Sequence, residues 1–184
     1  AARTMLTLPW SKVAGWATLI AFVFALAWAY VLTHFRVWGR EVIDAVFTLP
    51  MVLPPTVLGY YLLVVFGRRS PLGSWLEDTL GIRLIFSWQG AAVAASIVAF
   101  PLIYKAARAA MQDVEHQLEK AARLLGANET KVFFRVTLPL AWRGVLSGTM
   151  LAFARAMGEF GATLMIAGSI PGKTQTMSIA IYEA

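Results

Sequence analysis

Charged residues are absent from three long stretches of this chain, at residues 13–35, 45–67 and 84–104, and a fourth stretch at residues 144–170 contains only two. Each of the first three stretches has the roughly 17–25 residues with which an α-helix crosses a bilayer, and the fourth is slightly longer. Lipid offers the backbone no hydrogen-bond partners, so spanning segments of this kind are helices. Four buried helices of a soluble protein would have to be apolar on every face, which is unusual. The pattern therefore predicts an all-α, polytopic bundle of transmembrane helices.

The composition agrees with a membrane protein and limits the chemistry. Of the 184 residues, 59% are hydrophobic and 14% are charged, whereas a soluble domain has about 25% charged residues. The chain has no cysteine and only two histidines, His34 and His116. We therefore expect no disulfide, no metal site and no cofactor in this chain.

The basic residues outside the four stretches predict the orientation. The N-terminal tail, the loop after residue 67 and the C-terminal tail carry six Lys and Arg residues, whereas segments 36–44 and 105–143 carry nine. The side richer in Lys and Arg is usually cytoplasmic, which places the N-terminus outside and segment 105–143 inside. The net charge of +6 then reflects topology, because the sequence lacks the aromatic-interleaved basic groove of a nucleic-acid-binding protein.

Three prolines near the start of the second stretch, Pro50, Pro54 and Pro55, indicate an interrupted helix. Each proline removes a backbone N–H group and favours a kink. A kinked helix can simply be one that packs better, but three prolines so close together favour a bent helix beside a cavity.

The loop at residues 67–83 is predicted to lie outside the membrane. Its apolar residues, among them Trp75 and Leu76, have the spacing of a short amphipathic helix at the membrane interface. We expect Ser74 to cap this helix.

The polar segment 105–143 contains two helical patterns around a glycine. Apolar residues at positions 114, 118, 121, 122 and 125 have helical spacing, and Gly126 then suits a left-handed helix end. Asn128 is placed to cap a second helix, which Pro139 limits or bends. Two such helices suit docking into a groove of another protein, although an ordinary cytoplasmic loop folded against the bundle has the same pattern.

Residues 118–139 resemble the cytoplasmic loop of bacterial ABC-importer permeases. The signature of that loop is Glu-Ala-Ala, three residues, Gly, nine residues and Ile-x-Leu-Pro. The residues at those intervals here are Ala121, Ala122, Gly126, Val136, Leu138 and Pro139. In this family the loop fits a cleft in a separate ATP-binding subunit, so the resemblance implies that this segment couples the chain to such a partner.

The loop departs from the signature at one position. Lys120 stands where the signature has glutamate, and Glu119 comes one residue earlier. Glu119 would then be presented to a partner after a rotation of about 100° around the helix, and its spacing from Arg123 also suits an ion pair. The predicted coupling loop comprises Glu119, Lys120, Ala121, Ala122, Gly126, Ala127, Val136, Leu138 and Pro139.

Two further stretches, residues 49–63 and 153–176, resemble the molybdate permeases of this family. Sulfate permeases are similar around residues 158–161, so molybdate, sulfate and tungstate remain open as substrates. The resemblance covers residues 10–184 and implies a type I importer permease fold in the bacterial or archaeal cell membrane, which works by alternating access. It implies a homodimer, two ATPase subunits that bind ATP and magnesium, and an external solute-binding protein. Family members have a further span, which we expect to be absent after residues 180–184.

Arg155 and Glu159 are the two charged residues of the fourth stretch. A charge in a bilayer costs on the order of 3 kcal/mol, so both side chains should point inward and be paired. Their spacing of four residues places them on one face of a helix, either as a structural ion pair or beside a translocation pathway. Gly158 and Gly161 would allow neighbouring helices to approach closely there.

Residues 168–174 read Gly-Ser-Ile-Pro-Gly-Lys-Thr, which resembles the end of a phosphate-binding loop. The motif is one residue short, and Ala167 occupies the place of its first glycine. We therefore expect no nucleotide site, and an external dock for the binding protein instead. The residues predicted for this dock are Pro171, Gly172, Lys173 and Thr174.

An intramembrane enzyme and a stand-alone channel are the alternatives from other classes. The sequence has no cysteine and no His-Glu-x-x-His motif, and no span shows a nucleophile beside a base. A stand-alone channel would not need a coupling loop. The sequence thus predicts a permease subunit without enzymatic activity.

Overall fold

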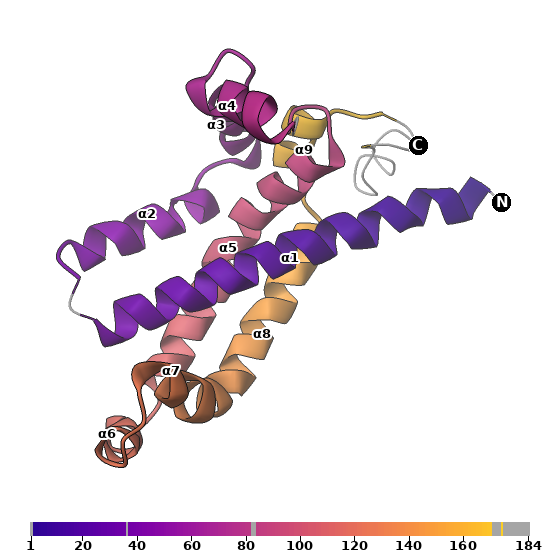
Figure 1. Ribbon diagram of the computed structural model, residues 1–184. Coiled ribbons are helices and arrows are strands. Elements are labelled where there is room, and N and C mark those ends of the chain that lie inside the picture. The colour runs from indigo at the N-terminus through magenta and orange to yellow at the C-terminus, as the bar shows by residue number, and fades with distance from the viewer. Residues whose placement is uncertain (1, 36, 82–83, 171–173, 175–184) are drawn as a thin grey trace.

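The computed structural model describes residues 2–35, 37–81, 84–170 and 174. Within these ranges the chain forms helices and no strand (Figure 1). The elements in chain order are α1 (Ala2–His34), α2 (Arg40–Val52), α3 (Pro55–Phe66), α4 (Pro71–Leu80), α5 (Trp88–Gln112), α6 (His116–Leu124), α7 (Glu129–Val132), the π-helical turn η1 (Phe133–Thr137), α8 (Leu138–Met157) and α9 (Gly161–Ala167).

Three helices are long and apolar enough to cross a membrane. They comprise Lys12–His34 of α1, Trp88–Gln112 of α5, and the continuous helix Glu129–Met157 formed by α7, η1 and α8. A fourth span exists if α2 and α3 are counted together, because this apolar pair is bent by 113°. The chain is therefore a multi-pass membrane protein.

The second predicted span is broken rather than continuous. Helix α2 ends at Val52, and Leu53 has extended backbone angles before Pro54 and Pro55. The residue before a proline is disfavoured in the helical region, and Pro55 then begins α3, where its missing N–H group costs nothing. The prolines thus turn the chain by 113° between two short helices.

The fourth predicted span is also interrupted. Helix α8 begins at Leu138, before the stretch predicted for the span, and ends at Met157, after which α9 starts at Gly161. Glu159 lies in this break, so it does not share a helix with Arg155 as the spacing of four residues predicted. Both spans are therefore interrupted inside apolar sequence.

Small residues hold α1, α5 and α8 together. Alanines that are almost completely buried line α1, and they pack against further alanines of α5 and α8. At Gly148 of α8 an added Cβ atom would lie 2.3 Å from the Cβ of Ala106 in α5. Close approach of this kind is how helices associate in lipid, where burial of apolar surface gives little driving force.

A second cluster joins the two helices that follow the breaks. Leu58 of α3, Ala162 and Ile166 of α9, and Ala94 and Val98 of α5 are buried together. Figure 1 shows α3, α4 and α9 at one end of the molecule and α6 and α7 at the other. The breaks and the predicted coupling loop therefore lie at opposite ends of α5.

Helix α4 is capped one turn earlier than predicted. Ser70, not Ser74, precedes the helix, and its Oγ accepts a hydrogen bond of 2.9 Å from the N–H group of Gly73. Pro71 occupies the first turn, where proline is favoured. The prediction for Ser74 was wrong because the helix begins at this Ser-Pro pair. Leu72 and Trp75 remain exposed on its surface.

Candidate functional site

The predicted coupling loop forms two helical segments around Gly126. Gly126 has a φ of +83°, and the N–H of Ala127 donates to the carbonyl oxygen of Ala122, which closes the end of α6. Asn128 caps α7 as predicted, since its Oδ1 accepts from the N–H group of Lys131 at 3.0 Å. The chain thus reverses within a few residues.

The second segment of the loop continues directly into the membrane helix. Residues Glu129–Met157 form one helix, and Pro139 lies in the first turn of its α8 part. The π-helical turn η1 lies immediately before this proline, and the N–H of Leu138 donates to the carbonyl oxygen of Phe133. Pro139 therefore does not end the helix, and a displacement of the loop would act on α8 without an intervening hinge of irregular chain.

The apex of the loop is apolar and exposed. Leu124 and Leu125 are 88% and 89% exposed, and Lys120 and Ala121 are exposed beside them. Large apolar side chains that project this far from a folded chain are typical of a protein–protein contact. The apex is therefore an exposed apolar surface, and contact of the loop with a partner stays a prediction.

Glu119 lies on the opposite face of α6 and is not available to a partner, contrary to the prediction. Its side chain is 2% exposed, and its Oε1 accepts hydrogen bonds from Nε2 of His34 at 2.8 Å and from Oγ1 of Thr137 at 2.6 Å. Burial opposes the charge of this carboxylate, but the two hydrogen bonds and the neighbouring charges together outweigh it, so the pKa of Glu119 lies below its usual value. The rotation relative to Lys120 turns Glu119 inward.

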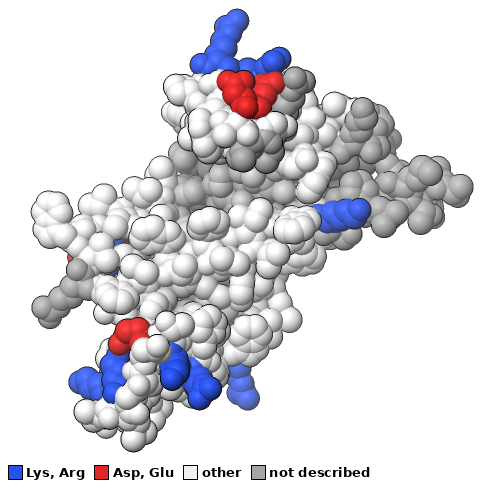
Figure 2. Space-filling view, in the orientation of Figure 1, with Lys and Arg blue, Asp and Glu red and all other residues white. Residues whose placement is uncertain are grey.

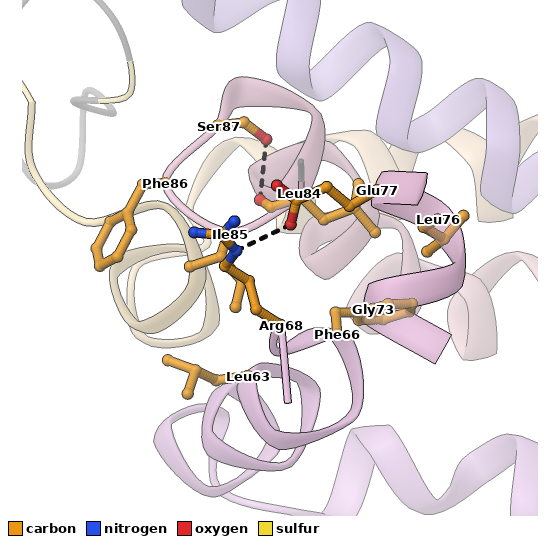
Figure 3. Close-up of a pocket in the computed structure, with 10 residues that line it drawn as sticks. All are labelled: Leu63, Phe66, Arg68, Gly73, Leu76, Glu77, Leu84, Ile85, Phe86 and Ser87. Atoms are coloured by element: carbon orange, nitrogen blue, oxygen red, sulfur yellow. Dashed lines mark hydrogen bonds and ion pairs between the residues drawn. The ribbon is translucent and has the colours of Figure 1, made fainter. Parts of the chain in front are cut away.

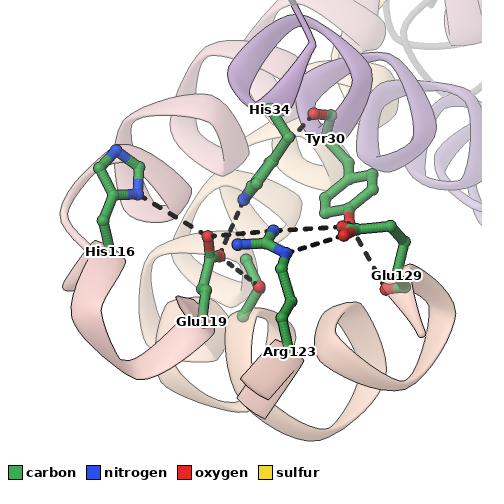
Figure 4. Close-up of polar contacts among 7 residues, drawn as sticks. Tyr30, His34, His116, Glu119, Arg123 and Glu129 are labelled. Carbon is green, nitrogen blue, oxygen red and sulfur yellow. Dashed lines mark hydrogen bonds and ion pairs between the residues drawn. The ribbon is translucent and has the colours of Figure 1, made fainter. Parts of the chain in front are cut away.

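Arg123 pairs with Glu129 more closely than with Glu119. Its Nε donates to Oε1 of Glu129 at 2.7 Å, whereas Glu119 is 3.7 Å away. Tyr30 of α1 also donates to Glu129, at 3.1 Å. These contacts and the one from His34 connect the end of α1 with both loop helices (Figure 4). The sequence did not predict this link because its residues are about 85–99 positions apart.

The charged pair of the fourth stretch bridges the second helix break. Nη1 of Arg155 donates to Oε2 of Glu159 at 2.7 Å, and Oε1 of Glu159 accepts from the N–H of Ala162 at 2.9 Å. The Glu159 side chain is 1% exposed and that of Arg155 is 39% exposed. Glu159 therefore neutralises Arg155 and also caps the start of α9.

The two helix breaks meet in space. An added Cβ at Gly161, where α9 starts, would lie 3.0 Å from the Cβ of Pro55, where α3 starts. A Cβ added at Gly158, in contrast, would have only carbonyl oxygens of its own helix within 4 Å among the described residues, so no close helix contact requires glycine at this position. Discontinuous helices that meet within a membrane bundle are typical of substrate pathways in transporters.

Most of the predicted external dock lies outside the described residues, namely Pro171, Gly172 and Lys173. Thr174 is described and is 6% exposed. Its Oγ1 accepts from the N–H of Ile170 at 3.1 Å. Thr174 therefore closes a turn, and its side chain is not a contact surface in this structure.

Two further features were missed by the sequence analysis. Asp44 of α2 pairs with Arg108 of α5 and accepts a hydrogen bond of 2.8 Å from Tyr104; the only signal was an acidic residue beside an apolar stretch. A cleft of about 650 Å³ lies between α3, α4 and residues 84–87, with the Arg68–Glu77 ion pair across it (Figure 3). No cluster of three potential metal ligands occurs among the described residues.

Comparison with known proteins gives matches over nearly the whole chain. The family described as "Binding-protein-dependent transport system inner membrane component" matches residues 13–183. "Molybdenum transport system permease protein ModB" of Escherichia coli (strain K12) is 47% identical over 171 residues, 93% of this chain and 75% of the relative. "Putative molybdenum transport system permease protein YvgM" of Bacillus subtilis (strain 168) is 42% identical over 95% of this chain and 75% of the relative. "Sulfate transport system permease protein CysW" of Synechococcus elongatus is 37% identical over 88% of this chain and 56% of the relative.

Proposed function

Because the chain belongs to the family of binding-protein-dependent transport system inner membrane components, we propose that it is the permease subunit of an ATP-driven molybdate importer. Two relatives named for molybdenum transport are 47% and 42% identical to it. The relative named for sulfate transport is more distant, at 37%. Sulfate is therefore the principal competitor as substrate, and tungstate is the other alternative.

The exposed apex of the coupling loop carries this proposal. Leu124 and Leu125 project from a short helix whose continuation, Glu129–Met157, is long enough to cross the membrane. A partner that binds the apex and changes conformation would move this helix directly. We assign this partner role to two ATPase subunits, which would bind ATP and magnesium and hydrolyse ATP, while the present chain supplies the pathway.

The charge distribution supports a cytoplasmic coupling loop. Figure 2 shows Lys and Arg gathered over the end of the molecule that carries α6 and α7. Lys120, Lys131, Arg135 and Arg143 are exposed there. Basic residues are retained on the cytoplasmic side during insertion, so we place this end inside and the N-terminus outside.

A second copy of the chain would complete the pathway. Helix α2, all of which is described, buries none of its residues within one copy. Val46, Leu49 and Val52 are among its exposed apolar side chains. A homodimer would cover part of this surface with protein and leave the rest to lipid.

We place the translocation pathway at the junction of the two helix breaks. Arg155 and Glu159 form a neutralised pair there, with Gly161 in contact with α3 and Gly158 at the end of α8. A bare cation would hold a divalent oxyanion strongly, whereas a paired one releases it more easily. An external solute-binding protein would deliver the anion, and residues 171–173 are our proposed dock.

The decisive experiment reconstitutes the chain in vesicles with its ATPase and binding protein. ATP-dependent uptake of labelled molybdate is measured, with unlabelled sulfate and tungstate as competitors. We expect uptake that requires ATP and resists excess sulfate. Inhibition by sulfate as strong as inhibition by unlabelled molybdate would refute the choice of molybdate, and uptake without the ATPase would refute the mechanism.

A further inference from the structure

The last turn of α1 touches the coupling loop through an ionic contact that is almost completely shielded from water. Tyr30 and His34 are one helical turn apart, and their rings stack with centroids 4.3 Å apart. The side chain of His34 is 6% exposed and that of Glu119 is 2% exposed. A carboxylate that is buried this deeply needs well-placed hydrogen-bond donors, since its charge would otherwise be left uncompensated.

Both ring nitrogens of His34 lie near hydrogen-bond acceptors. Nδ1 lies 3.2 Å from the carbonyl oxygen of Tyr30, and Nε2 lies 2.8 Å from Oε1 of Glu119. A carboxylate can only accept a hydrogen bond, so Nε2 is the donor to Glu119. The contact is thus a charge-assisted hydrogen bond, which is stronger than a neutral one.

Other groups around this contact fix it further. Thr137, at the end of η1, donates to the same Oε1 atom at 2.6 Å. One carboxylate oxygen therefore joins α1, α6 and the helix that leads into the membrane. The remaining titratable or charged groups facing the pair are Tyr30, His116, Arg123 and Glu129.

We propose that His34, Glu119 and Thr137 form a joint that transmits movement of the coupling loop to α1 as well as to α8. This inference rests on the proposed function and adds a second path by which movement of the loop reaches the membrane helices. The direct route runs along the chain from α7 into α8, whereas the joint connects α6 to a helix distant in sequence. Because α1 packs along α5 and α8 through alanines, a pull on His34 would tilt α1 against its neighbours.

His34 and Glu119 are positioning residues in this scheme, and they touch neither substrate nor ATPase. The joint should remain closed while the loop moves, because separation would leave the Glu119 carboxylate without its donors away from water. Its loss should therefore leave the exposed apex able to bind the ATPase. ATP hydrolysis would continue, but less oxyanion would be moved for each ATP consumed.

The test measures molybdate uptake per ATP hydrolysed in vesicles that contain the ATPase and the binding protein. His34→Phe keeps an aromatic ring against Tyr30 and removes both donors, and Glu119→Gln keeps the shape of the side chain. We expect either change to lower the ratio by roughly tenfold while the ATPase still co-purifies. His116→Phe is the matched control and should leave the ratio unchanged, since His116 is 67% exposed and 3.7 Å from Glu119.

A merely structural role predicts a different result. Uptake, hydrolysis and ATPase binding would then fall together at constant ratio, and that outcome would overturn the proposal. The absence of cysteine permits a second test with His34→Cys and Glu119→Cys combined. Bridging the two thiols with a short cross-linker should raise the ratio above that of the same variant without cross-linker. No gain on bridging would also overturn the proposal. Absence of ATP-dependent uptake by the unmodified chain would instead refute the proposed function.

Discussion

Gly59 of α3 and Ala162 of α9 lie so close together that a Cβ atom on Gly59 would be 2.9 Å from the Cα of Ala162. The same Cβ would be 2.8 Å from the Cβ of Met165. Neither neighbour is the flexible end of a side chain, so α3 and α9 would have to separate to admit even a methyl group. The contact that joins the two broken spans therefore depends on glycine at position 59.

Gly59→Ala should destabilise the protein. Alanine favours a helix by about 1 kcal/mol, but overpacking costs about 1–3 kcal/mol, and here the backbone of α9 cannot give way. We expect a lower midpoint of thermal unfolding in detergent and reduced uptake. Gly15→Ala is the control, because a Cβ there would have no described residue beyond its own stretch of helix within 4 Å. A higher unfolding temperature in both variants would contradict the close contact at Gly59.

The helices and the loop corner could be predicted from the sequence because their signals are local. Uncharged stretches indicated the spans, and Gly126 and Asn128 marked the end of one loop helix and the start of the next. The resemblance of residues 118–139 to a known loop then identified the candidate site. These features depend on residues a few positions apart, and such spacing is visible in the sequence itself.

Contacts between distant segments could not be predicted. The sequence contains no indication that His34 meets Glu119, or that Pro55 meets Gly161, because these pairs are created only when α1 and α3 pack in the bundle. The position of Glu159 was misjudged for a related reason. The apolar stretch extends beyond residues 158–160, although α8 ends at Met157. The carboxylate of Glu159 then accepts a hydrogen bond from the N–H of Ala162 at the start of α9.

Replacement of Leu124 and Leu125 by serine should weaken ATPase binding without affecting the fold. Both side chains are almost fully exposed, so their removal costs the isolated chain little. Apolar anchors of an interface typically contribute 1–2 kcal/mol or more each, so affinity should fall by about tenfold or more. Co-purification of the ATPase measures this, with Lys120→Ala as a control for loss of charge. Unchanged ATPase binding by the serine variant would show that the apex is not the dock.

Gly126→Pro should disconnect the two loop helices. Proline requires a φ near −65°, whereas Gly126 has a φ of +83° and donates its N–H to Arg123. We expect normal membrane insertion, weakened ATPase binding and loss of uptake, with a smaller loss in Gly126→Ala. Gly81→Ala introduces the same left-handed strain at the end of α4 and should leave coupling intact. Full coupling in Gly126→Pro would show that the corner does not orient the apex.

Acid should loosen the attachment of the loop to α1. The pKa of Glu119 lies below its ordinary value of 4.5 in the folded chain, so the folded state binds this proton less readily than the unfolded state. The stabilising contribution is therefore complete above about pH 4.5 and is lost as the pH falls through the folded pKa. Hydrogen exchange of the α6 amides should rise over this range. Glu119→Gln should reduce that dependence, and an equally steep dependence in this variant would assign the effect to another group.

Substitutions of Glu159 can separate its structural role from a role in the pathway. Glu159→Ala removes the partner of Arg155 and the acceptor for the N–H of Ala162, and should lower the stability of the subunit by about 2 kcal/mol. Glu159→Gln retains an oxygen that caps α9 but leaves Arg155 without a countercharge. This variant should remain folded.

If the pathway passes Arg155, the unpaired cation of Glu159→Gln should hold the oxyanion, which lowers both the maximal rate of uptake and the substrate concentration at half-maximal rate. Arg155→Gln combined with Glu159→Gln restores neutrality and should recover most of the rate. These rates are measured in vesicles at equal amounts of folded complex. If Glu159→Gln transports normally at equal folded amount, the pair is a structural element that joins α8 to α9, and the pathway lies elsewhere in the bundle.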